Sequence, residues 1–238
     1  MLVAAAVCPC PPLLVPEVAA GAAPELDAAR AACADALGVL AASRPDLLVV
    51  VGPAGPDGLE NHPQGAVGGF GGFGVDLEVR LGPAGDDSAQ ERELPQSLAV
   101  AAWLLARTDW AGSPVRGLGV GERLAGAPCA QIGKELAVEA ERVALLVMGD
   151  GSACRTLKAP GYLDARAVDF DAAAARALGA ADTAALAALD EQTAYELKAA
   201  GRAPWQVLAG AAQGAELGGT LLYDDAPYGV GYFVAAWS

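Results

Sequence analysis

Short apolar runs alternate with alanine-rich segments along most of this chain. The apolar runs span residues 2–7, 46–51, 115–120 and 143–148, and each ends at residues typical of turns. Continuous apolar runs of this length are typical of strands that are buried on both faces of a sheet. A last stretch, residues 219–237, contains two more strand-like pieces around an Asp-Asp-Ala-Pro turn.

The segments between these runs have helical character. The first lies between Pro24 and Pro45, which mark the start and end of a helix as prolines often do. Other predicted helices cover residues 94–108, 129–143, 170–178, 183–190, 193–200 and 204–213. Strands that alternate with helices predict βαβ units. We therefore expect an α/β fold with one domain over residues 1–238, in which a mostly parallel or mixed central sheet has helices on both faces.

Composition excludes several classes of protein. Hydrophobic residues make up 54% of the chain and the formal net charge is −14, which is typical of a globular protein without affinity for nucleic acid or anionic membranes. The 5 cysteines are odd in number and scattered, unlike a secreted disulfide framework. The apolar runs are too short to span a bilayer, and the N-terminus lacks the basic region of an export signal. We expect a cytoplasmic protein.

A glycine-rich stretch, "VGGFGGFGV" at residues 67–75, is the one motif that suggests phosphate binding. No Lys-Ser or Lys-Thr follows it, so the sequence gives little support for a phosphate loop. We expect a flexible loop that carries Phe70 and Phe73 at the rim of a site.

Candidate functional residues follow the predicted strands, because ligands of open α/β sheets bind beyond the carboxyl ends of the strands. Each has a structural alternative. Cys8 and Cys10 either bind a metal or take part in redox chemistry, or they are small apolar side chains buried at the end of a strand. His62 is a ligand or a surface-loop histidine. The remaining candidates are pocket residues, or the caps and turns of their own segments: Asp150, Ser152, Cys154, Asp224, Asp225 and Tyr228.

Four segments resemble, in order, those of the class III extradiol ring-cleavage dioxygenases of the B-subunit (LigB) type and the related Memo-like proteins. "CPCPPLLVPEV" resembles the opening Pro-His-Pro-Pro-Leu-Leu turn of that family, and "DLLVVVGPAGP" its second strand and Ser-Pro-His turn. "LLVMGDGSACRT" is similar to a Gly-Asp-x-Ser-His-Arg segment. "LLYDDAPYGVGYFVA" is similar to the C-terminal Tyr-Glu-Ala-Pro-Phe-Gly-Val-Gly-Tyr stretch and is the most specific of the four.

The resemblance implies a non-haem Fe(II) held by two histidines and a glutamate, with a further histidine as acid-base catalyst. The two ligand histidines fall on Cys10 and Ala54, and the catalytic histidine falls on Ala153. The glutamate falls on Asp225, or on Asp224 if the turn is shifted by one residue. Alanine has no donor atom, so the sequence predicts that this chain does not hold Fe(II) in the way the family does.

Three functions stay open at this point. The first is a relative that has lost ring cleavage and keeps a pocket for a small ligand. The second is an altered metal site for Zn or Cu, formed by Cys10 and Asp225 with His62 or Cys154. The third is a working dioxygenase or hydrolase with relocated residues. The resemblance also implies self-association, because members of the family are often dimers or larger.

Overall fold

Seven strands form one mixed sheet in this computed structural model, which describes residues 1–84, 92–108, 110 and 112–238. The strand order is β3-β6-β2-β7-β1-β9-β8. The central strands β1 (Leu2–Cys8), β2 (Leu47–Pro53), β6 (Val115–Val120) and β7 (Val143–Met148) run parallel to one another. The predicted α/β fold with a mixed sheet is confirmed.

Antiparallel strands extend the sheet on both sides. β3 (Leu59–His62) pairs with β6, and β9 (Tyr232–Trp237) pairs with both β1 and β8 (Gly219–Asp225). β3 is absent from the sequence prediction because its residues, Leu-Glu-Asn-His, are mostly polar. It lies at an edge of the sheet, where polar side chains reach solvent.

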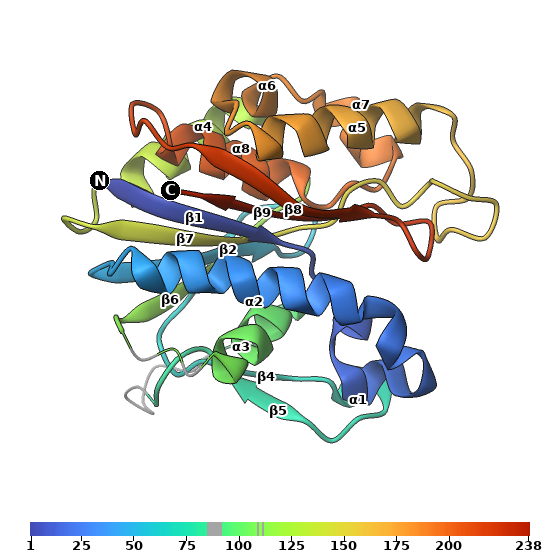
Figure 1. Cartoon of the computed structure of the whole chain (residues 1–238), viewed down its shortest axis with the longest axis horizontal. Helices are drawn as coiled ribbons and strands as arrows, with labels where there is room; N and C mark the ends of the chain where they lie inside the picture. Colours follow the sequence, from blue (N-terminus) through green and yellow to red (C-terminus); the bar gives the residue numbers. More distant parts are fainter. Residues whose placement is uncertain (85–91, 109, 111) are drawn as a thin grey trace.

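Helices cover both faces of the sheet, as the sequence predicts (Figure 1). One layer contains α1 (Pro16–Ala19), α2 (Asp27–Ala42) and α3 (Gln96–Arg107), together with the 3-10 turns Pro12–Leu14 and Ala20–Leu26. The opposite layer contains α4 (Gly126–Leu136), α5 (Arg166–Gly179), α6 (Thr183–Ala187), α7 (Glu191–Glu196) and α8 (Arg202–Ala211). In β1, Ala6 and Cys8 face the first layer while Ala5 and Val7 face the second.

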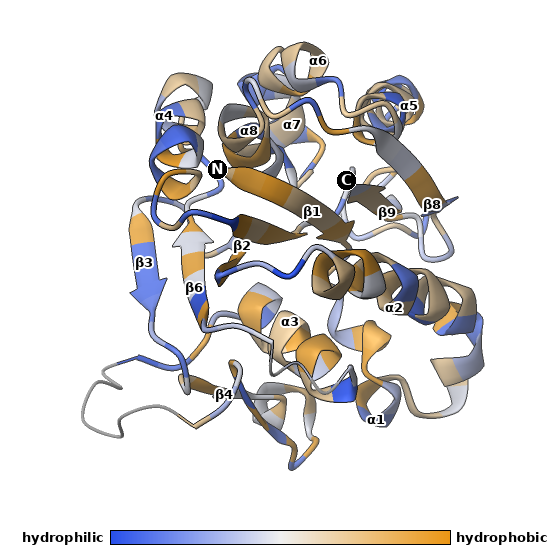
Figure 2. Cartoon of the chain, turned by 60° about the vertical axis from the view of Figure 1, so that its left-hand side comes forward, coloured by the Kyte–Doolittle hydropathy of each residue, from blue (hydrophilic) through white to orange (hydrophobic). Residues whose placement is uncertain are grey.

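The buried strands carry apolar residues along their whole length, whereas the helices at the surface have both apolar and polar residues (Figure 2). β7 is buried at every residue because α8 covers one of its faces and α2 and α3 cover the other. This central position explains why its sequence shows no alternation of apolar and polar residues. In the described part of the chain, no helix is both long and apolar enough to cross a membrane.

The glycine-rich stretch is not the flexible rim loop predicted from the sequence. It forms β4 (Val67–Gly69) and the 3-10 turn Gly71–Phe73, and β4 pairs antiparallel with β5 (Glu78–Arg80). The Phe70 side chain is fully buried and anchors this hairpin to the core beneath α3, whereas Phe73 is exposed. A buried aromatic ring explains why a stretch so rich in glycine is fixed to the domain.

Candidate functional site

Three adjacent parallel strands bring the positions singled out from the sequence to one edge of the sheet. β7 lies between β1 and β2, and its residues Val147 and Met148 are level with Val51 of β2 and Cys8 of β1. The segments that follow carry Cys10, Ala54 and Asp150, so these three residues meet beyond the same edge. This convergence is the arrangement expected from the sequence.

A hydrogen bond joins the first and third of these segments. The backbone N–H of Cys10 donates to Oδ1 of Asp150 over 2.8 Å. The backbone carbonyl of Asp150 in turn accepts a 2.8 Å hydrogen bond from the N–H of Gly201, just before α8. Burial raises the pKa of the Asp150 carboxyl to about 7, although the Cys10 N–H favours its charged form. Asp150 is therefore an acid that changes charge near neutral pH.

The cysteines at this edge are neutral thiols. Cys10 is 7% exposed, and its burial and the nearby carboxylates of Asp150 and Glu122 raise its pKa well above the ordinary value. Cys8 is fully buried and its thiol is hydrogen-bonded to that of Cys33 on α2, which raises its pKa. Cys8 therefore fills the core at the end of β1, which is the structural alternative given from the sequence.

Tyrosines and acidic residues of the C-terminal hairpin extend the site. Tyr232 begins β9 and is level with Asp225 of β8. Burial raises the pKa of the Tyr232 phenol, and the nearby Asp150 carboxylate adds to this effect. Asp225 and Asp224 are exposed, and Asp225 Oδ1 accepts a hydrogen bond from the N–H of Ala226. Asp225 thus stabilises its own turn.

Tyr228, another predicted pocket residue, is half-buried and lies near Glu25 and Arg30. Burial is the main cause of the raised pKa of its phenol, followed by the Glu25 carboxylate. Its hydroxyl therefore faces the segment that precedes α2.

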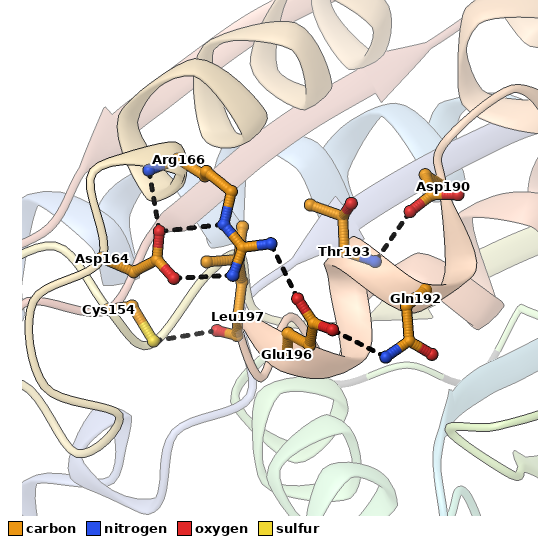
Figure 3. A network of polar contacts seen from close by, with 8 residues as sticks. All are labelled: Cys154, Asp164, Arg166, Asp190, Gln192, Thr193, Glu196 and Leu197. Carbon is orange, nitrogen blue, oxygen red and sulfur yellow. Dashed lines mark hydrogen bonds and ion pairs between the residues drawn. The ribbon is translucent and has the colours of Figure 1, made fainter.

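Ser152 and Cys154 hold the loop after β7 in place. Ser152 is fully buried: its N–H and hydroxyl donate to Asp171 of α5 over 2.7 and 2.8 Å, and Arg155 pairs with the same carboxylate at 3.0 Å. The Cys154 thiol donates to the carbonyl of Leu197 over 3.5 Å, as Figure 3 shows. Both side chains are thus used within the fold, and neither is free to bind a ligand.

The predicted metal site of Cys10, Asp225 and His62 is wrong, because the sheet separates its members. His62 lies on β3 and Asp225 on β8, the two opposite edge strands. His62 is also not the surface-loop histidine of the alternative prediction: it is 2% exposed, its Nε2 lies 3.7 Å from Glu60, and its burial lowers its pKa. Within the described residues, no three His, Cys, Asp or Glu side chains are grouped so that they could hold a metal ion.

The residues at the edge also do not fit the Fe(II) that the resemblance implies. Ala54 and Ala153 stand where that resemblance places two imidazoles, and they are 5% and 8% exposed. Neither offers a donor atom, and the thiol of Cys10 carries a proton at neutral pH. This donor set lacks the two imidazoles of a facial triad.

Two groups at the site were not predicted from the sequence. Glu122 lies two residues after the end of β6, and Tyr232 begins β9. The rule that ligands bind beyond strand ends could have found Glu122, whereas only the pairing of β9 with β1 and β8 places Tyr232 at this edge. A pocket of about 400 Å³ opens beside Glu122, and Lys198, Ala199 and Ala200 line its other wall, directly before Gly201.

Comparison with known proteins shows the fold alone. No family model matches the chain, and no curated protein matches it. Among solved structures, the chain is similar to the uncharacterized protein JW3007 from Escherichia coli K12, with a TM-score of 0.62 and 13% identity over 99% of each chain. A likeness that spans both chains at so low an identity supports the α/β architecture described above.

Proposed function

We propose that this chain is an extradiol-dioxygenase-like protein that does not carry out iron-dependent ring cleavage and binds a small molecule at the carboxyl edge of its sheet. The observation that carries the proposal is the set of residues at that edge. Ala54 and Ala153 offer no donor atoms, while Cys10 and Asp150 are joined by a backbone hydrogen bond. The backbone at the site is thus held in place by a hydrogen bond, while the side chains there do not suit Fe(II).

In this proposal, the charged groups around Cys10 and Tyr232 select the ligand. The groups that influence Cys10 and Tyr232 are Asp150, Glu122 and the phenols of Tyr223 and Tyr228, and none of them is a cation. Such surroundings favour a neutral or cationic molecule with hydrogen-bond donors, such as an amine or a phenol, over a carboxylate or a phosphate. The protein, in this proposal, is cytoplasmic and self-associating, and it binds neither nucleic acid nor membranes.

Two measurements test the loss of ring cleavage. The purified protein should contain far less than one equivalent of iron by elemental analysis, and it should consume no oxygen when Fe(II) and catechol are added under air. Oxygen uptake coupled to ring opening would overturn the proposal. One equivalent of zinc or copper that is lost in Cys10→Ala would instead establish the altered metal site.

A third measurement tests ligand binding at the strand edge. Thermal shifts with small amines and phenols should be larger than those with carboxylates, and Tyr232→Phe and Asp150→Asn should reduce them. Tyr162→Phe is a matched control, because Tyr162 is 63% exposed and lies in the loop before α5. Equal responses of all three variants would argue against binding at the strand edge.

A further inference from the structure

A buried guanidinium without an anionic partner lies near the candidate site. Arg202, in the first turn of α8, is 2% exposed. Its side chain donates to the carbonyls of Leu124 and Glu122 and, over 3.0 Å, to Oε1 of Gln206. These acceptors are all neutral, and Nε has no partner. Burying a cation is costly unless a negative group compensates it.

A second arginine lies beside it. Arg123 follows Glu122 in the loop after β6, and its guanidinium lies 4.5 Å from the centre of the Tyr195 ring and donates a hydrogen bond to the Tyr195 hydroxyl. Among the described residues, neither Arg123 nor Arg202 has a carboxylate within ion-pair distance. The chain has 29 acidic and 15 basic residues, so two neighbouring arginines that lack such partners are unexpected.

Both arginines line one pocket of about 280 Å³, together with Glu191, Gln192 and Tyr195. The Glu191 carboxylate is the opposing charge in this pocket, but its Oε1 accepts a 2.6 Å hydrogen bond from the N–H of Gly126, the first residue of α4. That carboxylate is therefore directed at the positive end of a helix. In the part of the chain that the structure describes, Arg123 and Arg202 therefore line the pocket without an ion-pair partner, and Nε of Arg202 has no hydrogen-bond partner.

The wall of the pocket is held in a fixed position. Asp190 caps α7 through a 2.8 Å hydrogen bond from the N–H of Thr193, and Glu196 at the end of α7 binds Arg166 and Gln192, both over 2.7 Å (Figure 3). Tyr195 lies between these anchors and also lines the 400 Å³ pocket beside Glu122. A rigid wall lowers the entropic cost of binding a ligand.

We propose that the pocket between Arg123, Arg202 and Tyr195 binds the oxyanion of a small molecule, a carboxylate or a phosphate group. Arginine suits this role because its planar guanidinium donates paired hydrogen bonds to such groups. The hydroxyl of Tyr195 accepts from Arg123, so its own proton is free to donate to the anion. The lining of this pocket does not include Cys10, Asp150 or Tyr232, and the proposal does not depend on the function proposed for the strand edge.

The experiment is a titration of the whole protein in a zwitterionic buffer with inorganic phosphate or succinate, monitored by calorimetry and by thermal unfolding. Sodium chloride at matched ionic strength is the control for screening. Binding should raise the unfolding temperature. Arg123→Ala should weaken the affinity about tenfold or more, because a charge-assisted contact is removed. Arg176→Ala, an exposed arginine on α5, should leave it unchanged.

The titrations with phosphate and with succinate show which kind of oxyanion the pocket binds. A response to phosphate alone assigns a phosphate group, a response to succinate alone assigns a carboxylate, and a response to both assigns an oxyanion site of broad specificity. No response beyond that to sodium chloride would overturn the proposal, as would equal affinities in Arg123→Ala and Arg176→Ala. Arg123 is exposed, so its variant avoids the folding defect that the buried Arg202 would introduce. Asp150→Asn should leave this binding intact, which distinguishes it from binding at the strand edge.

Discussion

The backbone N–H of Cys10 donates a 2.8 Å hydrogen bond to Oδ1 of Asp150 and so ties the end of β1 to the end of β7. This contact fixes both residues at the edge where the candidate site lies. Asp150 is thereby a half-buried acid whose carboxyl group accepts a backbone hydrogen bond from Cys10. Several measurable properties of the protein depend on this arrangement and on the residues that support it.

The stability of the protein should depend on the charge of Asp150. Its pKa is about 7 in the folded chain and ordinarily 3.8, so the folded state binds the proton more tightly and stability falls as pH rises from about 4 to about 7. Asp150→Asn keeps an oxygen for the Cys10 N–H and removes the charge. Relative to wild type, the variant should gain roughly 3 kcal/mol between pH 5 and pH 8, from about 1.4 kcal/mol per pH unit.

Urea unfolding at the two pH values measures this gain. Asp225→Asn is the matched control, because Asp225 is exposed at the same edge. A constant difference between Asp150→Asn and wild type across this pH range would show that Asp150 does not titrate there.

Asp171 should be more important for stability than an ordinary helical aspartate. It is 1% exposed and accepts hydrogen bonds from Ser152 and Arg155. Asp171→Ala leaves these donors without an acceptor in the core and should cost roughly 3–5 kcal/mol. Asp171→Asn, which keeps one oxygen acceptor, should cost less.

Chemical denaturation of both Asp171 variants checks this order. Asp35→Ala, an exposed position on α2, should change the free energy of unfolding by less than about 0.5 kcal/mol. If Asp171→Ala cost no more than Asp35→Ala, the loop after β7 would have another support.

Gly149 is needed because the end of β7 approaches the start of α8 closely. A Cβ atom on Gly149 would lie 2.4 Å from the Cα of Gly201, so Gly149→Ala must move backbone and should cost roughly 1–3 kcal/mol. Gly38→Ala on α2 meets no atom within 4 Å and should instead stabilise the helix by about 0.5–1 kcal/mol. Melting temperatures of the pair test these opposite signs, and destabilisation of both variants by the same amount would contradict them.

The cysteines should react slowly in the native protein. All five are free and buried, and burial raises the pKa of Cys10, of Cys154 and, to about 11, of Cys129. Thiolates are the reactive form, so Ellman's reagent at pH 8 should label the native chain far more slowly than the chain in guanidinium chloride, where all five thiols react. Rapid labelling of Cys10 in the native protein would show instead that its thiol is accessible and reactive.

The pattern of apolar runs was sufficient to predict the layered α/β fold and the edge at which the candidate residues converge. Strands that are buried on both faces have no polar alternation, and this local property is visible in the sequence. The absence of donor atoms at Ala54 and Ala153 is equally a property of the sequence, because no fold can give a methyl group a lone pair. The family resemblance itself remains a prediction.

Only the tertiary structure placed His62 and Asp225 on opposite edge strands and so excluded a metal site formed by both with Cys10. Sequence separation contains no information about strand order, which depends on how polar edge strands such as β3 pair. The same holds for the Cys10–Asp150 hydrogen bond, the burial of Phe70 and the pocket formed by Arg123 and Arg202. Each depends on contacts between segments that are distant in the chain, and such contacts are decided by the packing of the whole domain.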